Sequence, residues 1–132
     1  MKLITRDTDY AIRAVCYIGK QDKDVVSVTE LVASLKIPRP FLRKILQTLN
    51  KKGILRSIKG SCGGFSLASP CKRILLTDIM RSFQGDLSLN ECYFKKHVCP
   101  HTSRCRLRSA VNRIEKYVFK QLGSINISQL IG

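Results

Sequence analysis

Acidic residues are scarce in this sequence. Its 132 residues include nine Asp and Glu against 24 Lys and Arg, which gives a formal net charge of +15 at pH 7. Between Glu30 and Asp78 there is no acidic residue, whereas ten basic residues occur there. Because an ordinary solvated surface mixes both signs, a stretch of one sign favours a binding face for a polyanion, either nucleic acid or an anionic membrane face.

Long apolar runs are absent as well. No stretch approaches the roughly 20 residues of a membrane-spanning helix, and Lys2, Arg6 and Asp7 interrupt the N-terminus too early for a secretory signal. We therefore expect a cytoplasmic protein without a membrane partner. Thiols stay reduced in that compartment, so we interpret the six cysteines as metal ligands, redox sensors or buried thiols before disulfides.

Recognisable enzyme signatures are also missing. The chain has no glycine-rich nucleotide fingerprint and no nucleophile–base constellation, so we do not expect an enzyme. Its composition, with 44% apolar and 25% charged residues, is typical of a globular protein. The length suits one domain, or one compact domain with an appendage.

Local patterns in the first half of the chain predict three helices. Apolar residues recur with a helical period in residues 7–19, and a capping box that begins at Ser27 opens a short helix of about residues 28–35. A third helix follows the turn 37–40, where proline fits a first helical turn, and Gly53 is placed to end it. Its predicted apolar face comprises Phe41, Leu42, Ile45, Leu46 and Leu49.

The period then changes to that of β-strands. Residues 54–58 predict a strand, residues 59–64 a flexible loop rich in glycine, and residues 65–68 a return strand. Helix, turn, helix and basic hairpin together predict a winged helix-turn-helix, whose second helix reads base edges while the hairpin lies near the DNA backbone or minor groove. The residues expected to contact double-stranded DNA are Arg39, Arg43, Lys44, Gln47 and Thr48 on the helix, and Lys59 and Ser61 in the loop.

The C-terminal part predicts two further helices. Residues 75–83 form a candidate helix packed on the domain, and from Leu107 to Leu122 apolar residues recur at steps of three and four, like a heptad seam. One helix on a small domain cannot bury such a seam, so we expect a homodimer, with docking onto its own domain as the alternative. The predicted fold class is mainly α with a small β-hairpin wing: a winged helix-turn-helix at 1–83, a cysteine-rich loop at 84–105, and a long dimerisation helix with a C-terminal tail at 106–132.

Three cysteines, Cys92, Cys99 and Cys105, lie in this irregular loop. Thiolates are soft ligands that suit an iron–sulfur cluster, zinc or copper(I). Nearby Lys and Arg residues favour the thiolate form and offset the negative charge of a thiolate-bound cluster. The residues by themselves leave three possibilities open: an iron–sulfur cluster, a zinc site completed by His97 or His101, and a metal-free thiol sensor.

The other three cysteines have no cysteine close by in sequence. Cys16 lies beside the apolar face of the first predicted helix, and we interpret it as a buried small hydrophobic residue. Cys62 in the hairpin loop and Cys71 after Pro70 are interpreted as structural or incidental.

Over nearly its whole length the sequence resembles the Rrf2 family of bacterial winged-helix transcription regulators, in the branch that contains IscR, NsrR and RirA. Residues 1–3 and 8–13 are similar to the family's first helix, and residues 37–49 to its recognition helix. Residues 53–55 and 60–65 are similar to its strand and glycine-rich wing, and the three loop cysteines fall where its cluster ligands fall.

The resemblance implies a homodimeric DNA-binding regulator, a repressor, that senses nitric oxide, iron or cluster supply, or redox state through a [2Fe–2S] or [4Fe–4S] cluster. Members similar to IscR carry a histidine ligand three residues after the last cysteine, where this chain has Arg108, which cannot ligate. Members similar to NsrR use an aspartate from the first helix of the partner subunit, and Asp9 is similar to that residue. Asp9 is therefore the candidate fourth ligand, with His97 or His101 as the alternative.

Two other functions are kept as alternatives. The first is the same fold without a cluster, regulated by thiol oxidation, zinc, a small effector or a partner protein. The second is an enzyme or electron carrier built on the same cluster, which would leave the basic winged helix unexplained.

Overall fold

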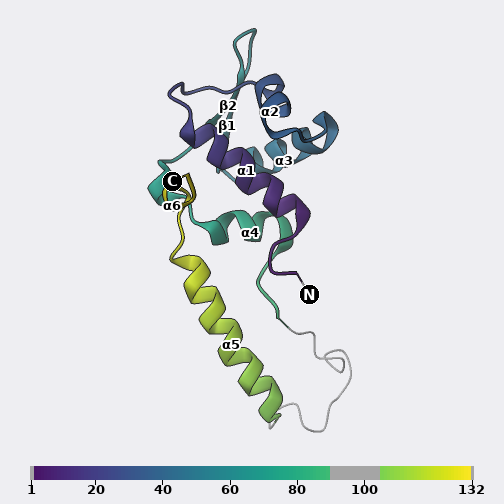
Figure 1. Ribbon diagram of the computed structural model, residues 1–132, viewed down its shortest axis with the longest axis vertical. Helices are drawn as coiled ribbons and strands as arrows, with labels where there is room; N and C mark the ends of the chain where they lie inside the picture. The colour runs from purple at the N-terminus through teal and green to yellow at the C-terminus, as the bar shows by residue number, and fades with distance from the viewer. Residues whose placement is uncertain (1, 90–104, 132) are drawn as a thin grey trace.

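The computed structural model describes residues 2–89 and 105–131. Helices precede and follow one two-stranded hairpin (Figure 1), so the predicted fold class, mainly α with a hairpin wing, is confirmed. The elements in chain order are α1 (Arg6–Lys20), α2 (Val28–Leu35), α3 (Arg39–Lys51), β1 (Leu55–Ile58), β2 (Gly64–Leu67), the 3-10 turn η1 (Cys71–Arg73), α4 (Leu76–Gln84), α5 (Arg106–Gly123) and α6 (Ile127–Ile131).

Side-chain caps fix where the first two helices begin. The Thr5 side chain accepts a hydrogen bond from the backbone N–H of Thr8 at the start of α1, and Ser27 accepts one from the N–H of Glu30 at the start of α2. The Glu30 carboxylate accepts hydrogen bonds from Lys23 and Tyr17 instead of reaching back to Ser27. These two bonds, that of Lys23 first, lower the pKa of Glu30. The capping box is thus half formed, and its acidic member ties α2 to α1 instead.

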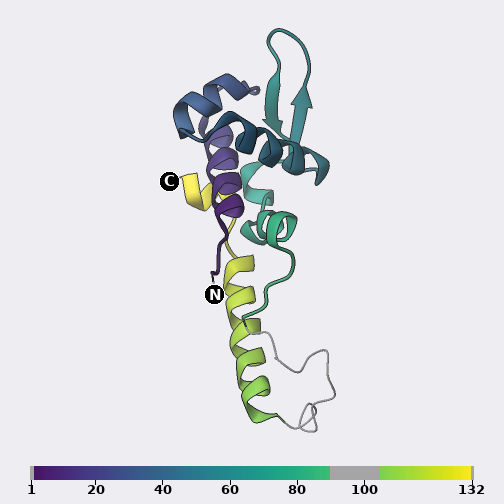
Figure 2. The same ribbon diagram turned by 90° about the vertical axis from the view of Figure 1, so that its right-hand side faces the viewer.

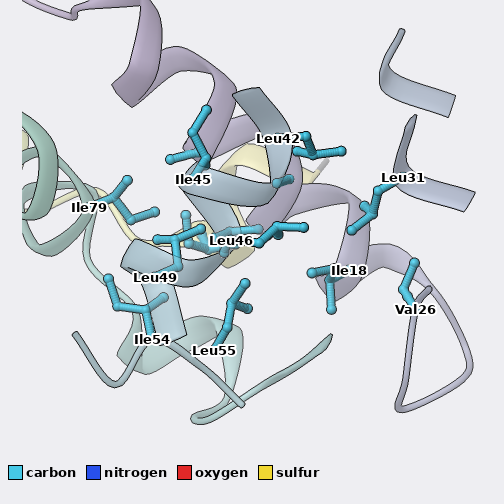
Figure 3. Packing of buried hydrophobic residues seen from close by; sticks show 14 of the residues in the cluster. Ile18, Val26, Leu31, Leu42, Ile45, Leu46, Leu49, Ile54, Leu55 and Ile79 are labelled. Carbon is cyan, nitrogen blue, oxygen red and sulfur yellow. The ribbon is translucent and has the colours of Figure 1, made fainter. Parts of the chain in front are cut away.

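The apolar faces of α1, α2 and α3 meet in one core (Figure 3). Figure 3 shows Leu42, Ile45, Leu46 and Leu49 pointing from α3 into this core, and all four are buried. Phe41 does not join them: its side chain is 46% exposed, and the Arg6 guanidinium lies 5.3 Å from the centre of its ring. The prediction that Phe41 belongs to the apolar face is therefore wrong, because position 41 lies at the edge of the face that α1 covers.

The hairpin β1–β2 with its connecting loop, which we call the wing, is anchored at its base. Its strands are antiparallel, with Leu55 opposite Leu67. Val26, just before α2, exchanges two backbone hydrogen bonds of 2.9 Å with Phe65. Only glycine permits this approach at position 64, since a Cβ there would lie 2.2 Å from the Val26 carbonyl oxygen. The wing is therefore held in a fixed position relative to α2.

Helix α5 leaves the body of the molecule and extends away from the wing in both views (Figures 1 and 2). Three of its apolar side chains are exposed, namely Leu107 (69%), Ile114 (57%) and Tyr117 (65%). Docking of the whole seam onto the chain's own domain, the alternative to a dimer, does not occur in the described residues. Within the described part of the chain, no helix combines the length and apolar character needed to cross a membrane.

The C-terminal helix α6 returns to the body and packs on α1. Ile127 is fully buried in the same core as Ala11 and Val15, and backbone bonds from Leu76 to Ile125 and from Ile127 to Ile74 join this end of the chain to the start of α4. Residues 106–132, grouped together from the sequence, thus divide into a projecting helix and a short helix that completes the N-terminal core.

Candidate nucleic-acid interface

A groove of about 530 Å³ separates α3 from the wing. Arg43 and Gln47 line it from α3, and Lys59 and Ser61 line it from the wing. The structure thus brings together four of the seven residues predicted to contact DNA. They come from α3 and from the wing, which are separate in sequence and adjacent in the fold. Among the described residues around this groove, the charged ones are Arg43 and Lys59, both basic, which suits a phosphate backbone.

The remaining three predicted residues lie elsewhere on α3. Arg39 is exposed, and its Nη2 donates a hydrogen bond of 3.1 Å to Thr29 Oγ1 in the first turn of α2. Lys44 is exposed but does not line the groove. Thr48 is half-buried, and its hydroxyl donates to the Lys44 carbonyl oxygen at 2.9 Å. Thr48 is therefore the least suited of the seven to donate to a base edge.

The groove also includes three residues that were not predicted from the sequence. Asn50 lines it from α3, and Ser27 and Thr29 line it from the start of α2. Asn50 follows Arg43 by seven residues, or two helical turns, so the helical period predicts that both lie on one face. No local pattern indicates Ser27 and Thr29, because their approach to the groove depends on how α2 packs against α3.

Of the predicted metal ligands, Cys92 and Cys99 lie outside the described residues, as do the alternatives His97 and His101. Cys105 is the N-cap of α5: its half-buried Sγ accepts a hydrogen bond of 3.5 Å from the backbone N–H of Arg108. The described residues contain no group of three potential ligands close enough to share a metal ion.

The structure does not bring Asp9 and Cys105 together within one chain. Asp9 lies in the first turn of α1, where its Oδ2 accepts a hydrogen bond of 3.0 Å from Arg13 Nε. Cys105 caps the end of α5 that points away from α1 (Figures 1 and 2). The 18 residues of α5 span about 27 Å at 1.5 Å per residue, far beyond the length of a bond to a shared metal.

Helix α3, the anchored wing and the basic groove between them define a winged helix-turn-helix protein of the class that binds DNA. The sequence profile of the Rrf2 family, described as "Iron-dependent Transcriptional regulator", matches residues 4–132. The chain belongs to the Rrf2 family of transcriptional regulators, whose members bind DNA.

Individual relatives agree with this assignment. An HTH-type transcriptional regulator of Aquifex aeolicus is 38% identical over 90 residues, which are 68% of this chain and 62% of that relative, so the match spans less than two thirds of its length. The HTH-type transcriptional regulator NsrR of Oceanobacillus iheyensis is 30% identical over 126 residues, which cover 94% of this chain and 86% of NsrR.

Two solved structures show the same fold. CymR, the global cysteine regulator of B. subtilis, superposes with a TM-score of 0.82 at 23% identity, covering 99% of this chain and 97% of CymR. IscR of T. potens superposes with a TM-score of 0.77 at 20% identity, covering 99% of this chain and 86% of IscR.

The groove predicts different effects for its two cations. Arg43→Ala should remove about 1–3 kcal/mol of discrimination at one base pair, because we expect Arg43 to pair with the edge of a guanine. Lys59→Ala should weaken binding to all sequences alike and reduce the slope of log affinity against log salt by about one unit, because we expect Lys59 to contact a phosphate. Titration of a selected operator and a scrambled duplex at several salt concentrations measures both effects.

Arg56→Ala is the matched control, since Arg56 is an exposed cation of β1 that lines a separate hollow beside Gly19 and Lys23. It removes the same charge and should leave discrimination unchanged. Unaltered operator affinity and salt slope in both groove variants would refute the assignment.

Proposed function

We propose that this chain is a homodimeric repressor whose affinity for a near-palindromic operator is set by an iron–sulfur cluster. One observation carries the proposal: the residues that flank segment 90–104, which bears Cys92 and Cys99, contact α5 on both sides. Before the segment, the Leu89 N–H donates a hydrogen bond of 3.1 Å to Glu115 of α5, and after it Cys105 caps the same helix. Ligand binding by these cysteines would therefore act on the helix with the exposed apolar face.

The dimer part of the proposal rests on that face. Leu107 and Ile114 lie seven residues apart, two turns along α5, and Tyr117 follows three residues later, so one side of the helix carries them. A second copy of α5 would cover these side chains and gain the free energy of burying apolar surface. A twofold dimer then presents two α3 helices to two half-sites, spaced by about 34–36 Å or a multiple of it.

The ligand set proposed for the cluster is Cys92, Cys99 and Cys105, with Asp9 of the second subunit. The donor chemistry fits: sulfur is a soft ligand for iron, and Cys105 lies at the N-terminus of α5 next to Arg106 and Arg108, whose positive charges would offset the negative charge of a cluster. Asp9 is separated from Cys105 within one chain, so a second copy must supply it. When bound, such a cluster supplies a centre that nitric oxide, oxidants or iron loss would alter.

A polar contact links α1, which carries Asp9, to the end of α4, just before the cysteine segment. The hydroxyl of the fully buried Thr8 donates to Gln84 Oε1 at 2.7 Å, and the N–H of Thr5 donates to the same oxygen at 3.1 Å. Gln84 Nε2 in turn donates to the Leu3 carbonyl oxygen. Through this contact, Gln84 would pass a change at the cysteine segment to α1, which packs against the DNA-binding helix α3.

A second candidate function is the same regulator without a cluster, which responds to thiol chemistry, zinc, a small effector or a partner protein. The likeness to CymR, a cysteine regulator by its description, favours it, since that fold agrees with this chain over 99% of its length. In either form we propose a cytoplasmic protein with a DNA-binding unit at 1–83 and a sensing segment at 84–105. From residue 106 a dimerisation helix follows, and then a C-terminal segment whose helix α6 returns to the core.

Anaerobic purification separates the two functions. The freshly purified chain should be brown, with iron and sulfide in near-equal amounts. Colourless protein with stoichiometric zinc would show that the cysteines hold a structural metal instead of a sensor cluster. Colourless protein without metal, made in cells supplied with iron, would favour the thiol or effector regulator.

A further inference from the structure

Two cysteines that are 55 positions apart in sequence meet on one side of α1. The Sγ of Cys71, at the start of η1, lies only 2.7 Å from the point where a Cβ on Gly19 would stand. The sulfur thus rests against the α1 backbone at a place that only a glycine leaves open. Cys16 precedes Gly19 by three residues, and side chains three residues apart on a helix are neighbours, with Cβ atoms about 5–6 Å apart.

The surroundings of the two thiols are also shared. Both side chains are free, half-buried, and packed against the same hydrophobic core. Burial raises the pKa of Cys16, and the nearby Cys71 raises it further. The effect of Cys71 on Cys16 agrees with the position of the Cys71 sulfur beside Gly19, one helical turn from Cys16. Nothing in the local sequence connects the first helix with the turn after the wing, so the sequence does not predict this pair.

We propose that Cys16 and Cys71 form an intramolecular disulfide when the protein meets a hydroperoxide, as a redox site within the DNA-binding unit that requires no metal. Cys71 is the attacking group in this scheme, since burial disfavours the thiolate of Cys16. The Cys71 thiolate attacks the outer oxygen of the hydroperoxide and the O–O bond breaks. The departing oxygen takes up the proton that the Cys71 thiol released and leaves as an alcohol or water. Cys16 then attacks the resulting sulfenic acid, its proton leaves with the hydroxide as water, and the two sulfurs have together lost two electrons.

The bond would tie α1 to the segment that leads from the wing to α4. Because it closes a long loop, it should restrict the unfolded chain and raise the thermal midpoint of the native protein by several degrees. Reduction with dithiothreitol should reverse the shift. This effect does not depend on whether the loop cysteines hold a cluster.

The test uses the full chain, freed of metal by a chelator and treated with hydrogen peroxide before remaining thiols are blocked with N-ethylmaleimide. Trypsin should release residues 14–20, with Cys16, and residues 60–72, with Cys62 and Cys71. The Cys62→Ser chain therefore places one cysteine in each fragment, and it also serves as the matched control. In this chain we expect the two fragments to be joined, with a mass two hydrogens below their sum.

Cys16→Ser and Cys71→Ser should each lose the thermal shift, whereas Cys62→Ser should keep it. The mass measurement stands even where a serine variant fails to fold, because it needs neither Cys16 nor Cys71 to be changed. Recovery of both fragments as N-ethylmaleimide adducts after oxidation of other thiols, or their linkage to other cysteines, would overturn the proposal.

Discussion

Replacement of Cys92, Cys99 or Cys105 by alanine, one at a time, is expected to abolish the brown colour and the iron and sulfide content of anaerobic protein. The loop contains these three cysteines and no others, so the loss of any one leaves too few soft ligands for a cluster. Cys105→Ala should act in two ways, since it also removes the side chain that caps α5. Absorption spectra with iron and sulfide assays measure the loss.

Cys62→Ala is the matched control for this series. Cys62 is exposed in the wing, at the opposite end of the molecule from the end of α5 that Cys105 caps. This variant should keep a full cluster. Retention of the cluster in any of the three loop variants would show that the ligand set is wrong.

Asp9→Ala should leave a cluster with an altered spectrum and faster decay in air, because a carboxylate ligand is replaced by water or by a thiol. The change also breaks the ion pair of Asp9 with Arg13, so Arg13→Ala is the appropriate control: it removes the pair and keeps the carboxylate. A cluster unaffected by Asp9→Ala but destroyed by His97→Ala or His101→Ala would move the fourth ligand into the cysteine segment.

Ile114→Lys is expected to convert the protein to monomers. The side chain is 57% exposed in the single chain, so a lysine there costs little in monomer folding, but it would place two like charges at a twofold interface without partners. A monomer contacts one half-site instead of two, and operator affinity should fall by about 100-fold or more, towards non-specific binding. Sedimentation and operator titration measure the two effects.

Asn112→Lys is the matched control for the dimer, since it adds the same charge to an exposed position on another side of α5. It should remain dimeric and bind the operator with wild-type affinity. A wild-type chain that sediments as a monomer at micromolar concentration would contradict the proposed dimer, as would an Ile114→Lys dimer.

Local patterns were enough to predict the elements that position the groove. Helix α2 begins at Val28 and ends at Leu35, as predicted, because the Ser27 cap and the turn at Pro38 act within a few residues of the helix. The hairpin likewise follows from alternation and glycine content. Four of the residues predicted to contact DNA line the groove, because the helix face and the hairpin loop that carry them were predicted correctly. They are Arg43, Gln47, Lys59 and Ser61.

The features that escaped prediction depend on contacts between distant segments. Helix α6 has five residues, too few for a periodic signal, and it is stabilised by burying Ile127 against α1. Phe41 fits the apolar period of α3, but its ring contacts the guanidinium of Arg6, the first residue of α1, instead of the apolar core. The pairing of Cys16 with Cys71 arises only when η1 packs beside Gly19. None of these contacts leaves a trace in the local sequence.

We propose that the state of the cysteine segment sets the affinity of the α3–wing groove for DNA. The most direct measurement of this dependence is an anaerobic titration of one operator, at one salt concentration, with cluster-loaded and cluster-free preparations of the same chain, each verified by iron and sulfide content. We expect dissociation constants that differ by about tenfold or more, within the range of ordinary coupling between two sites. Equal dissociation constants for the two preparations would contradict the account.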